Sequence, residues 1–166
     1  MERPLILKAE PDSRPVSEDL RRMLMELAAL TDKLTVEWTP PSDGPERPCV
    51  RVLRADGTDT GIAFHGVPGG HEFNSFVVGL YNAAGPGQSI DPALAEAIAA
   101  IDRPLDLQIV VALSCTMCPE LVIAAQKIAA SNPLVTAKVY DVNHFPELRE
   151  RYKIMSVPCL IINKAK

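Results

Sequence analysis

Two cysteines in a C-x-x-C arrangement, Cys115 and Cys118, constrain the fold of this chain more than any other feature of its sequence. The apolar run 109–113 just before them predicts a strand buried on both faces, which is typical of a central parallel strand. Residues 119–131 carry apolar side chains at helical spacing, so they predict a helix that begins at Pro119. The pair therefore lies where a buried strand meets a helix, as in a βα unit.

This position predicts redox chemistry. The free N–H groups and the dipole at a helix N-terminus favour negative charge, so we expect Cys115 to have a lowered pKa and thiolate character. Cys118 lies one helical turn further on, within disulfide reach. Cys115 would then attack a disulfide of another protein, and Cys118 would resolve the mixed disulfide. Thr116 and Met117 bring no charge, so the helix dipole must supply most of the stabilisation of the thiolate.

Other uses of a C-x-x-C pair fit less well. A zinc site needs four ligands, and no second C-x-x-C or nearby Cys–His pair follows. Attachment of c-type haem requires a histidine after the second cysteine, where this chain has Pro119. An iron–sulfur cluster would have to recruit Cys49 and Cys159 from separate predicted strands. We therefore favour a redox dithiol without a metal. Cys49 and Cys159 are interpreted as small buried residues, with a third redox thiol at Cys159 as the alternative.

Length and charge narrow the class further. The 166 residues suit one domain or two small ones. With 17 Lys and Arg against 21 Asp and Glu, the net charge of −4 offers no basic surface for nucleic acid or an anionic membrane. No apolar run approaches the ~20 residues of a bilayer span, and no signal peptide pattern is visible. We expect an acidic, soluble, cytoplasmic protein.

The rest of the chain alternates between strand and helix patterns. Strands are predicted at residues 5–7, 34–38, 49–52, 61–64, 105–113, 135–139 and 158–162. Helices are predicted at residues 17–30, 71–84, 93–101, 119–131 and 146–152. Ser17 and Asp91 are the expected N-caps of two of these helices, and Phe73 is expected on the buried face of the helix 71–84. This pattern predicts an α/β fold.

A Pro-Cys pair begins a predicted strand twice, at residues 48–49 and 158–159. A proline at the start of a strand is unusual, so the match suggests two copies of one βαβ-type fold. We divide the chain into a first fold without a dithiol at 1–84, a linker with a helix at 85–103, and a second fold with the dithiol at 104–166. The second copy lacks the strand and helix that close the first. Its last strand should therefore be covered by residues beyond Lys166 or by a homodimer.

The dithiol after a central strand, with Pro158 opening a later strand, resembles the thioredoxin-like fold, in which that proline is cis. More specifically, the chain resembles the N-terminal domain of the alkyl hydroperoxide reductase flavoprotein subunit. That domain contains two tandem thioredoxin-like folds, and only the second keeps the dithiol. The matching stretches are residues 27–34, 70–73, 114–119 and 157–158. The family usually has His-Asn where this chain has Thr116 and Met117.

The resemblance implies a thiol–disulfide oxidoreductase. Its Cys115/Cys118 dithiol would relay electrons from a flavoprotein reductase module to the disulfide of a peroxiredoxin-type peroxidase. FAD and NADH would then be bound by that module, and no cofactor by this chain. Two other functions remain open: a general glutaredoxin-like protein disulfide reductase, and a non-catalytic adaptor module.

The resemblance also implies roles for residues outside the cysteine pair. Glu72 would lie near the dithiol and relay protons, although an acidic residue in a first helical turn can simply complement the dipole. Pro158 would belong to the catalytic site. Thr116, Met117 and Val157 would contact the substrate protein, and the backbone of Val157 would pair with its extended segment.

Overall fold

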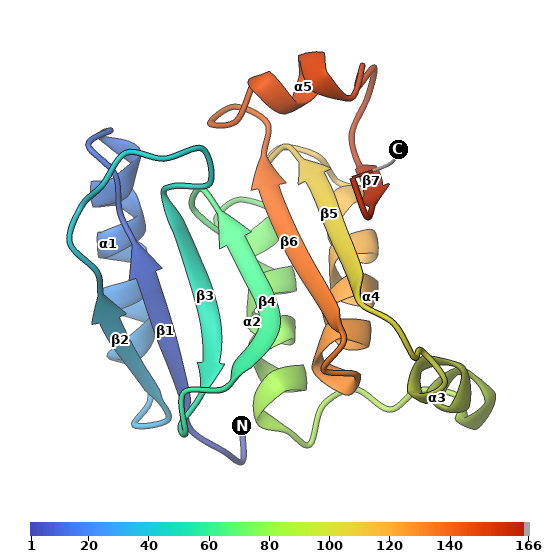
Figure 1. The fold of residues 1–166 in the computed structure, drawn as a ribbon. Helices are drawn as coiled ribbons and strands as arrows, with labels where there is room; N and C mark the ends of the chain where they lie inside the picture. Colours follow the sequence, from blue (N-terminus) through green and yellow to red (C-terminus); the bar gives the residue numbers. More distant parts are fainter. Residues whose placement is uncertain (165–166) are drawn as a thin grey trace.

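The computed structural model describes residues 1–164, which form seven strands and five helices (Figure 1). The strands are β1 (Leu5–Glu10), β2 (Leu34–Trp38), β3 (Cys49–Arg54), β4 (Asp59–His65), β5 (Leu105–Val111), β6 (Val135–Asp141) and β7 (Cys159–Ile162). The helices are α1 (Val16–Ala28), α2 (Glu72–Ala84), α3 (Pro92–Ala99), α4 (Cys118–Ser131) and α5 (Glu147–Arg151). Each predicted strand and helix is present, with its ends displaced by a few residues.

All seven strands form one sheet, in the order β2-β1-β3-β4-β6-β5-β7. The pairs β1–β2, β4–β6 and β5–β6 are parallel, whereas β1–β3, β3–β4 and β5–β7 are antiparallel. The parallel pairing of β4 with β6 joins the first half of the chain to the second. The two halves therefore share a continuous sheet.

The two halves repeat the same topology. Each begins with a parallel strand–helix–strand unit, β1-α1-β2 and β5-α4-β6, and each then adds an antiparallel strand, β3 or β7, beside its first strand. The bonds Arg47–Pro48 and Val157–Pro158, which precede β3 and β7, are both cis. The first half continues with β4 and α2. Within residues 1–164, no strand pairs with the outer edge of β7.

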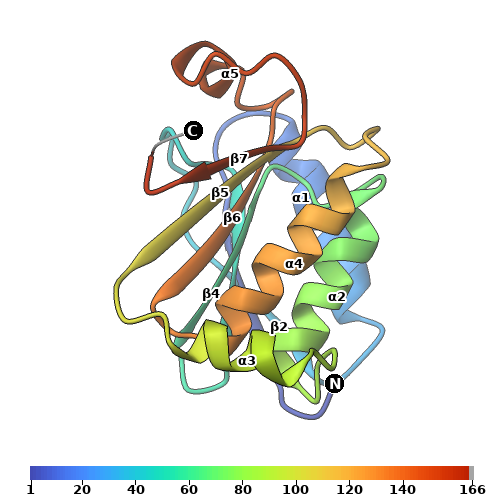
Figure 2. The same ribbon diagram turned by 90° about the vertical axis from the view of Figure 1, so that its right-hand side faces the viewer.

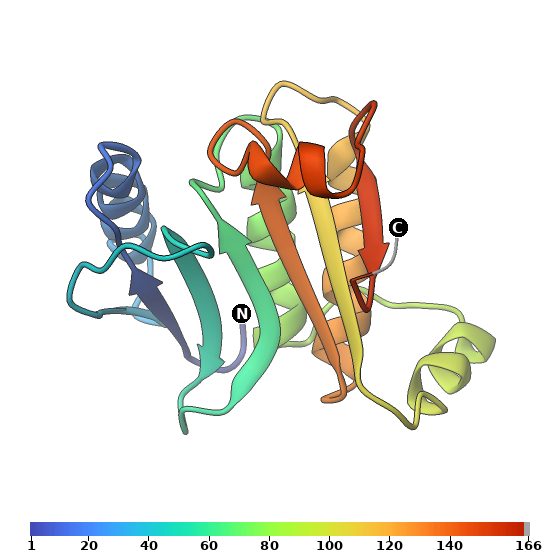
Figure 3. The same ribbon diagram turned by 45° about the horizontal axis from the view of Figure 1, so that its top comes forward.

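Helices α1, α2 and α4 cover one face of the sheet (Figure 2). The main core lies between this helical layer and the sheet, because alternate strand residues such as Leu5, Leu7 and Ala9 point toward the helices. On the opposite face, a smaller apolar cluster that includes Val110, Tyr140 and Leu148 lies beneath α5, and the rest of that face is open (Figure 3). No helix within residues 1–164 has both the length and the apolar character needed to span a membrane.

Two local predictions were wrong. Helix α1 begins at Val16, and the Ser17 hydroxyl donates to Asp12 Oδ1 at 2.7 Å rather than capping the helix. The nearby carboxylate takes the hydroxyl that would otherwise serve as a cap. Phe73 is 44% exposed because the first turn of α2 extends beyond the core. The predicted cap at Asp91 is confirmed, since its carboxylate accepts the Ala93 N–H at 2.8 Å.

Candidate redox site

The site lies in the loop that leads from the end of β5 to the start of α4. Cys115 and Cys118 form a disulfide there, with their Cα atoms 5.6 Å apart, a separation typical of disulfides. Cys115 is half-buried, whereas Cys118 is fully buried. Thr116 and Met117, between them, are both exposed. Another protein can therefore approach the sulfur of Cys115 but not that of Cys118.

Helix α4 directs its N-terminus at the accessible sulfur. The backbone N–H of Cys118, the first residue of α4, donates to Cys115 Sγ at 3.1 Å. Once the disulfide is reduced, this N–H and the helix dipole would favour the thiolate of Cys115 over the thiol. The geometry therefore agrees with the prediction that Cys115 is the nucleophile.

The loop before β7 forms the other wall of the site. The antiparallel pairing of β5 with β7 ends at Val110 and Cys159, so the two residues before Cys159 lie beside the loop that carries the disulfide. The carbonyl oxygen of Val157 lies 4.0 Å from Cys115 Sγ. The Val157–Pro158 bond is cis, as predicted. Val157 and Pro158 therefore stand next to the accessible sulfur.

The start of α2 packs against the same loop. The backbone N–H of His71 donates to the carbonyl oxygen of Leu113 at 3.0 Å, two residues before Cys115. Gly70 has φ +54°, and a Cβ atom at this position would lie only 2.6 Å from that oxygen. Only glycine allows so close an approach in this conformation. The segment that carries Glu72 is thereby fixed beside the disulfide loop.

The Glu72 side chain is completely buried. Its Oε2 accepts a hydrogen bond from the hydroxyl of Ser75, and its Oε1 has no hydrogen-bond partner. Burial raises the pKa of the Glu72 carboxyl, and the Ser75 hydroxyl and His71 offset only part of that effect. Glu72 is therefore not an exposed acid that merely complements the helix dipole. It is a buried carboxyl group that favours its protonated form, whereas His71 next to it is exposed.

In the first repeat, the corresponding position holds an arginine. Arg14 precedes Pro15 at the start of α1, as Cys118 precedes Pro119 at the start of α4. Arg14 Nη2 donates to the carbonyl oxygen of Arg47 at 2.6 Å. That carbonyl precedes a cis proline, as does the Val157 carbonyl beside the disulfide. A guanidinium group has thus replaced the redox pair, which explains why the first repeat carries no dithiol.

Arg14 also links the two repeats. Its Nε forms an ion pair with Asp12 at 2.7 Å, and its Nη1 donates to the carbonyl oxygen of His144, in the loop between β6 and α5. Burial alone would raise the pKa of Asp12, but hydrogen bonds from Arg14 and Ser17 outweigh burial and lower it. Sequence reasoning missed this network. The available signal was an Arg-Pro pair placed like Cys118-Pro119.

The two remaining cysteines are free and buried, in agreement with their interpretation as small buried residues. The Cys49 sulfur lies 3.4 Å from Glu10 Oε2. Burial and the neighbouring Glu10 raise the pKa of Cys49 to about 12, so this thiol does not ionise near neutral pH. No group of three or more His, Cys, Asp and Glu side chains within residues 1–164 is arranged to hold a metal ion.

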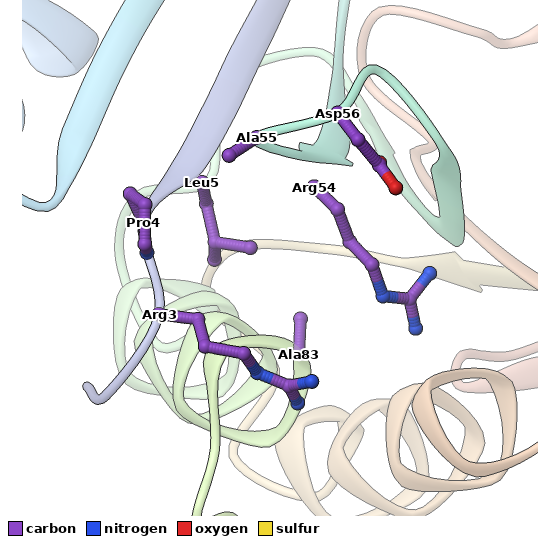
Figure 4. Close-up of a pocket in the computed structure, with 7 residues that line it drawn as sticks. All are labelled: Arg3, Pro4, Leu5, Arg54, Ala55, Asp56 and Ala83. Carbon is purple, nitrogen blue, oxygen red and sulfur yellow. The ribbon is translucent and has the colours of Figure 1, made fainter.

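A separate cavity of about 300 Å³ contains no part of this site (Figure 4). It lies at the N-terminal end of β1, whereas the disulfide follows the C-terminal end of β5, which runs in the same direction as β1. Its two arginines already donate to backbone carbonyls, Arg3 to Ala84 and Arg54 to Asp59. The cavity therefore lies at the opposite end of the sheet from the redox chemistry.

A disulfide at a helix N-terminus, after a central parallel strand and beside a cis proline, defines a thioredoxin-like redox domain. The family described as "Thioredoxin domain" matches residues 105–165. The solved N-terminal domain of alkyl hydroperoxide reductase AhpF from Enterococcus faecalis superposes with a TM-score of 0.93 at 36% identity, covering 100% of this chain and 84% of that one. The chain belongs to the family of N-terminal domains of alkyl hydroperoxide reductase AhpF.

Curated relatives are much longer than this chain. The AhpF protein of the alkyl hydroperoxide reductase of Pseudomonas aeruginosa is 32% identical over 96% of this chain and 30% of its own length. A protein named NADH dehydrogenase from Ferdinandcohnia aciditolerans is 32% identical over 98% of this chain and 31% of its own length. The chain thus spans less than a third of these two relatives.

Proposed function

We propose that this domain relays electrons through the Cys115/Cys118 disulfide, from a flavoprotein reductase module to the disulfide of a peroxiredoxin-type peroxidase. The observation that carries the proposal is the asymmetry of the disulfide. Cys115 is accessible and receives the N–H of the helix terminus, whereas Cys118 is completely buried. Family membership supports the choice of partners. FAD and NADH would be bound by the reductase module, outside this chain.

The electron relay consists of two thiol–disulfide exchanges. A dithiol of the reductase module supplies two electrons and two protons, which convert the disulfide into two thiols. The Cys115 thiolate then attacks the peroxidase disulfide, forms a mixed disulfide and releases one peroxidase thiolate. Cys118 attacks the Cys115 sulfur, which releases the second peroxidase thiolate and re-forms the disulfide.

The neighbouring residues would serve these exchanges. The carboxyl group of Glu72 would receive the Cys118 proton during resolution and return it during reduction. The backbone of Val157 would pair with the extended peroxidase segment that carries the disulfide, while Pro158 holds that backbone beside Cys115. Thr116 and Met117 would contact the same segment because both are exposed next to the sulfur.

The test is reconstitution of peroxide-dependent NADH oxidation. The chain is combined with a flavoprotein reductase module, a peroxiredoxin-type peroxidase and a hydroperoxide, and NADH absorbance is followed. We expect turnover that requires this chain and is abolished by Cys115→Ser, whereas Cys49→Ser leaves it unchanged. With Cys118→Ser, the mixed disulfide with the peroxidase should accumulate and be visible on a non-reducing gel.

Two other results would overturn the proposal in different ways. Rapid reduction of generic protein disulfides without any reduction of the peroxidase would favour the general glutaredoxin-like reductase. A Cys115–Cys118 pair that does not cycle reversibly between dithiol and disulfide would favour the non-catalytic adaptor. Thiol titration after mild reduction and reoxidation separates the adaptor from both enzymes.

A further inference from the structure

Two of the five methionines of the chain flank the disulfide, and they are the most exposed ones. Met117, between the two cysteines, is 66% exposed, and Met155, two residues before Val157, is 89% exposed. Because Val157 lies beside Cys115 Sγ, the segments that carry both thioethers lie on either side of the accessible sulfur. We call Met117 and Met155 the methionine rim.

The other three methionines provide an internal comparison. Met25 on α1 is 52% exposed, Met1 is 39% exposed, and Met23 is partly buried against the core. Helix α1 packs against the first repeat, so Met23 and Met25 lie outside the disulfide loop and the loop before β7. The methionine rim therefore differs from the rest in position as well as in exposure.

Thioethers react directly with hydroperoxides. A peroxide transfers one oxygen atom to the methionine sulfur, which is oxidised to a sulfoxide, and the peroxide is reduced to water or an alcohol. The product replaces a flexible apolar side chain with a polar, chiral one. A surface that makes apolar contact through methionine is weakened by this change.

We propose that the methionine rim is a peroxide-sensitive modification site. Oxidation of Met117 and Met155 to sulfoxides by a hydroperoxide weakens the docking of the partner protein at the disulfide, and so slows electron transfer when peroxide is in excess. This inference rests on the proposed function, because that function brings the site into contact with a protein that consumes hydroperoxides.

The first experiment measures the modification itself. The disulfide form of the chain, in which Cys115 and Cys118 are protected, is incubated with hydrogen peroxide, and peptide masses are followed with time. We expect Met155 and Met117 to gain one oxygen atom about fivefold faster than Met23, since sulfoxide formation follows exposure. Equal rates at Met23 and at the methionine rim would overturn the proposal.

The second experiment measures docking. The oxidised chain is reduced at its disulfide, and its reaction is timed with the peroxidase disulfide, with insulin and with the small disulfide DTNB. We expect the reactions with both proteins to slow about fivefold, equivalent to roughly 1 kcal/mol of lost contact, while the DTNB reaction stays unchanged. Equal slowing with DTNB would mean that oxidation damages the dithiol itself, and would overturn the proposal.

Variants separate the rim from general oxidation. Met117→Leu/Met155→Leu should keep the unoxidised rate and resist the effect of peroxide, whereas Met117→Gln/Met155→Gln should slow the protein reactions without peroxide. Met25→Gln is the matched control and should have no effect. Equal slowing in Met25→Gln, or no slowing in the double Gln variant, would overturn the proposal. If the proposed function fails instead, the untreated chain will react with insulin but not with the peroxidase.

Discussion

The Glu72 carboxyl shows how burial changes the chemistry of one side chain. Its pKa is raised in the folded protein above the ordinary value of 4.5. Above pH 4.5, the unfolded chain therefore releases a proton that the folded chain retains. Stability should fall as the pH rises from 4.5 through the pKa of the folded protein, because the folded state must then bury a charge.

We therefore predict that Glu72→Gln, which cannot ionise, gains stability relative to the wild type as the pH rises from 5 to 8. Urea unfolding at a series of pH values measures this difference. Glu120→Gln, in the exposed first turn of α4, is the control and should show no such trend. A stability difference that does not change with pH would contradict the raised pKa.

The cysteine pair should show two distinct thiols after reduction. We predict that Cys115 is alkylated first, with a pKa below the free value of ~8.5, because an N–H at the helix terminus contacts its sulfur. Cys118 should react far more slowly because it is buried. Iodoacetamide labelling against pH, read by peptide mass, tests this order. Faster labelling of Cys118, or ordinary titration of Cys115, would contradict it.

At the level of helices and strands, the Arg14 network replaces a redox site by an ion pair. Arg14→Met removes the partner of the buried Asp12 and three hydrogen bonds from the guanidinium group. We predict a loss of about 2 kcal/mol in the free energy of unfolding, reduced from the value of a fully buried pair because Arg14 is partly exposed.

Urea unfolding of Arg14→Met, compared with Arg22→Met on the exposed face of α1, measures this loss. Arg22 pairs with Asp19 at the surface, so its removal should cost little. Asp12→Asn/Arg14→Met should recover part of the stability, because no unpaired charge is left buried. Equal effects of the two single substitutions would show that the network contributes nothing.

Sequence periodicity predicted the strands and helices because each buries one face on the same layer. It also placed the redox pair, since C-x-x-C after a buried strand is a local pattern. The burial of Glu72 was not predictable, because it depends on how α2 packs against the disulfide loop. The Arg14 contact with His144 joins residues far apart in the chain, so no local pattern records it.

For the whole molecule, the junction of the two repeats lies where β4 pairs with β6. The rings of His65 and Tyr140 stack there with their centroids 4.1 Å apart, and His65 Nδ1 lies 2.6 Å from the carbonyl oxygen of Glu46. Burial lowers the pKa of His65 to about 4, which outweighs the attraction of Glu46 and adds to the repulsion from Arg51 and Lys138. The junction therefore holds a neutral histidine.

Acid should consequently weaken this junction. Below pH 6.5 the unfolded chain binds a proton at His65 that the folded chain does not, so stability falls between pH 6.5 and about 4. We predict a loss on the order of 3 kcal/mol at most over this range. His65→Phe, which keeps an aromatic ring against Tyr140, should lose this slope, and the exposed His71→Gln should retain it. Thermal unfolding against pH decides between these outcomes.

The outer edge of β7 is the remaining unpaired part of the sheet within residues 1–164 that carries exposed apolar side chains of the second repeat. Ile162 is 42% exposed and lines an apolar groove of about 360 Å³ between α3, α4 and β7. An apolar edge strand with unpaired backbone groups is a template for another strand. We propose that two copies of this chain pair through β7.

Ile162→Lys should weaken this association about tenfold or more, because it places a charge in the apolar interface. Sedimentation velocity over a wide range of concentration measures the dissociation constant. Leu30→Lys, at an equally solvent-exposed leucine just after α1, is the control and should leave the association unchanged. A chain that stays monomeric at every concentration, or an association that Ile162→Lys does not affect, would show that β7 is not the dimer contact.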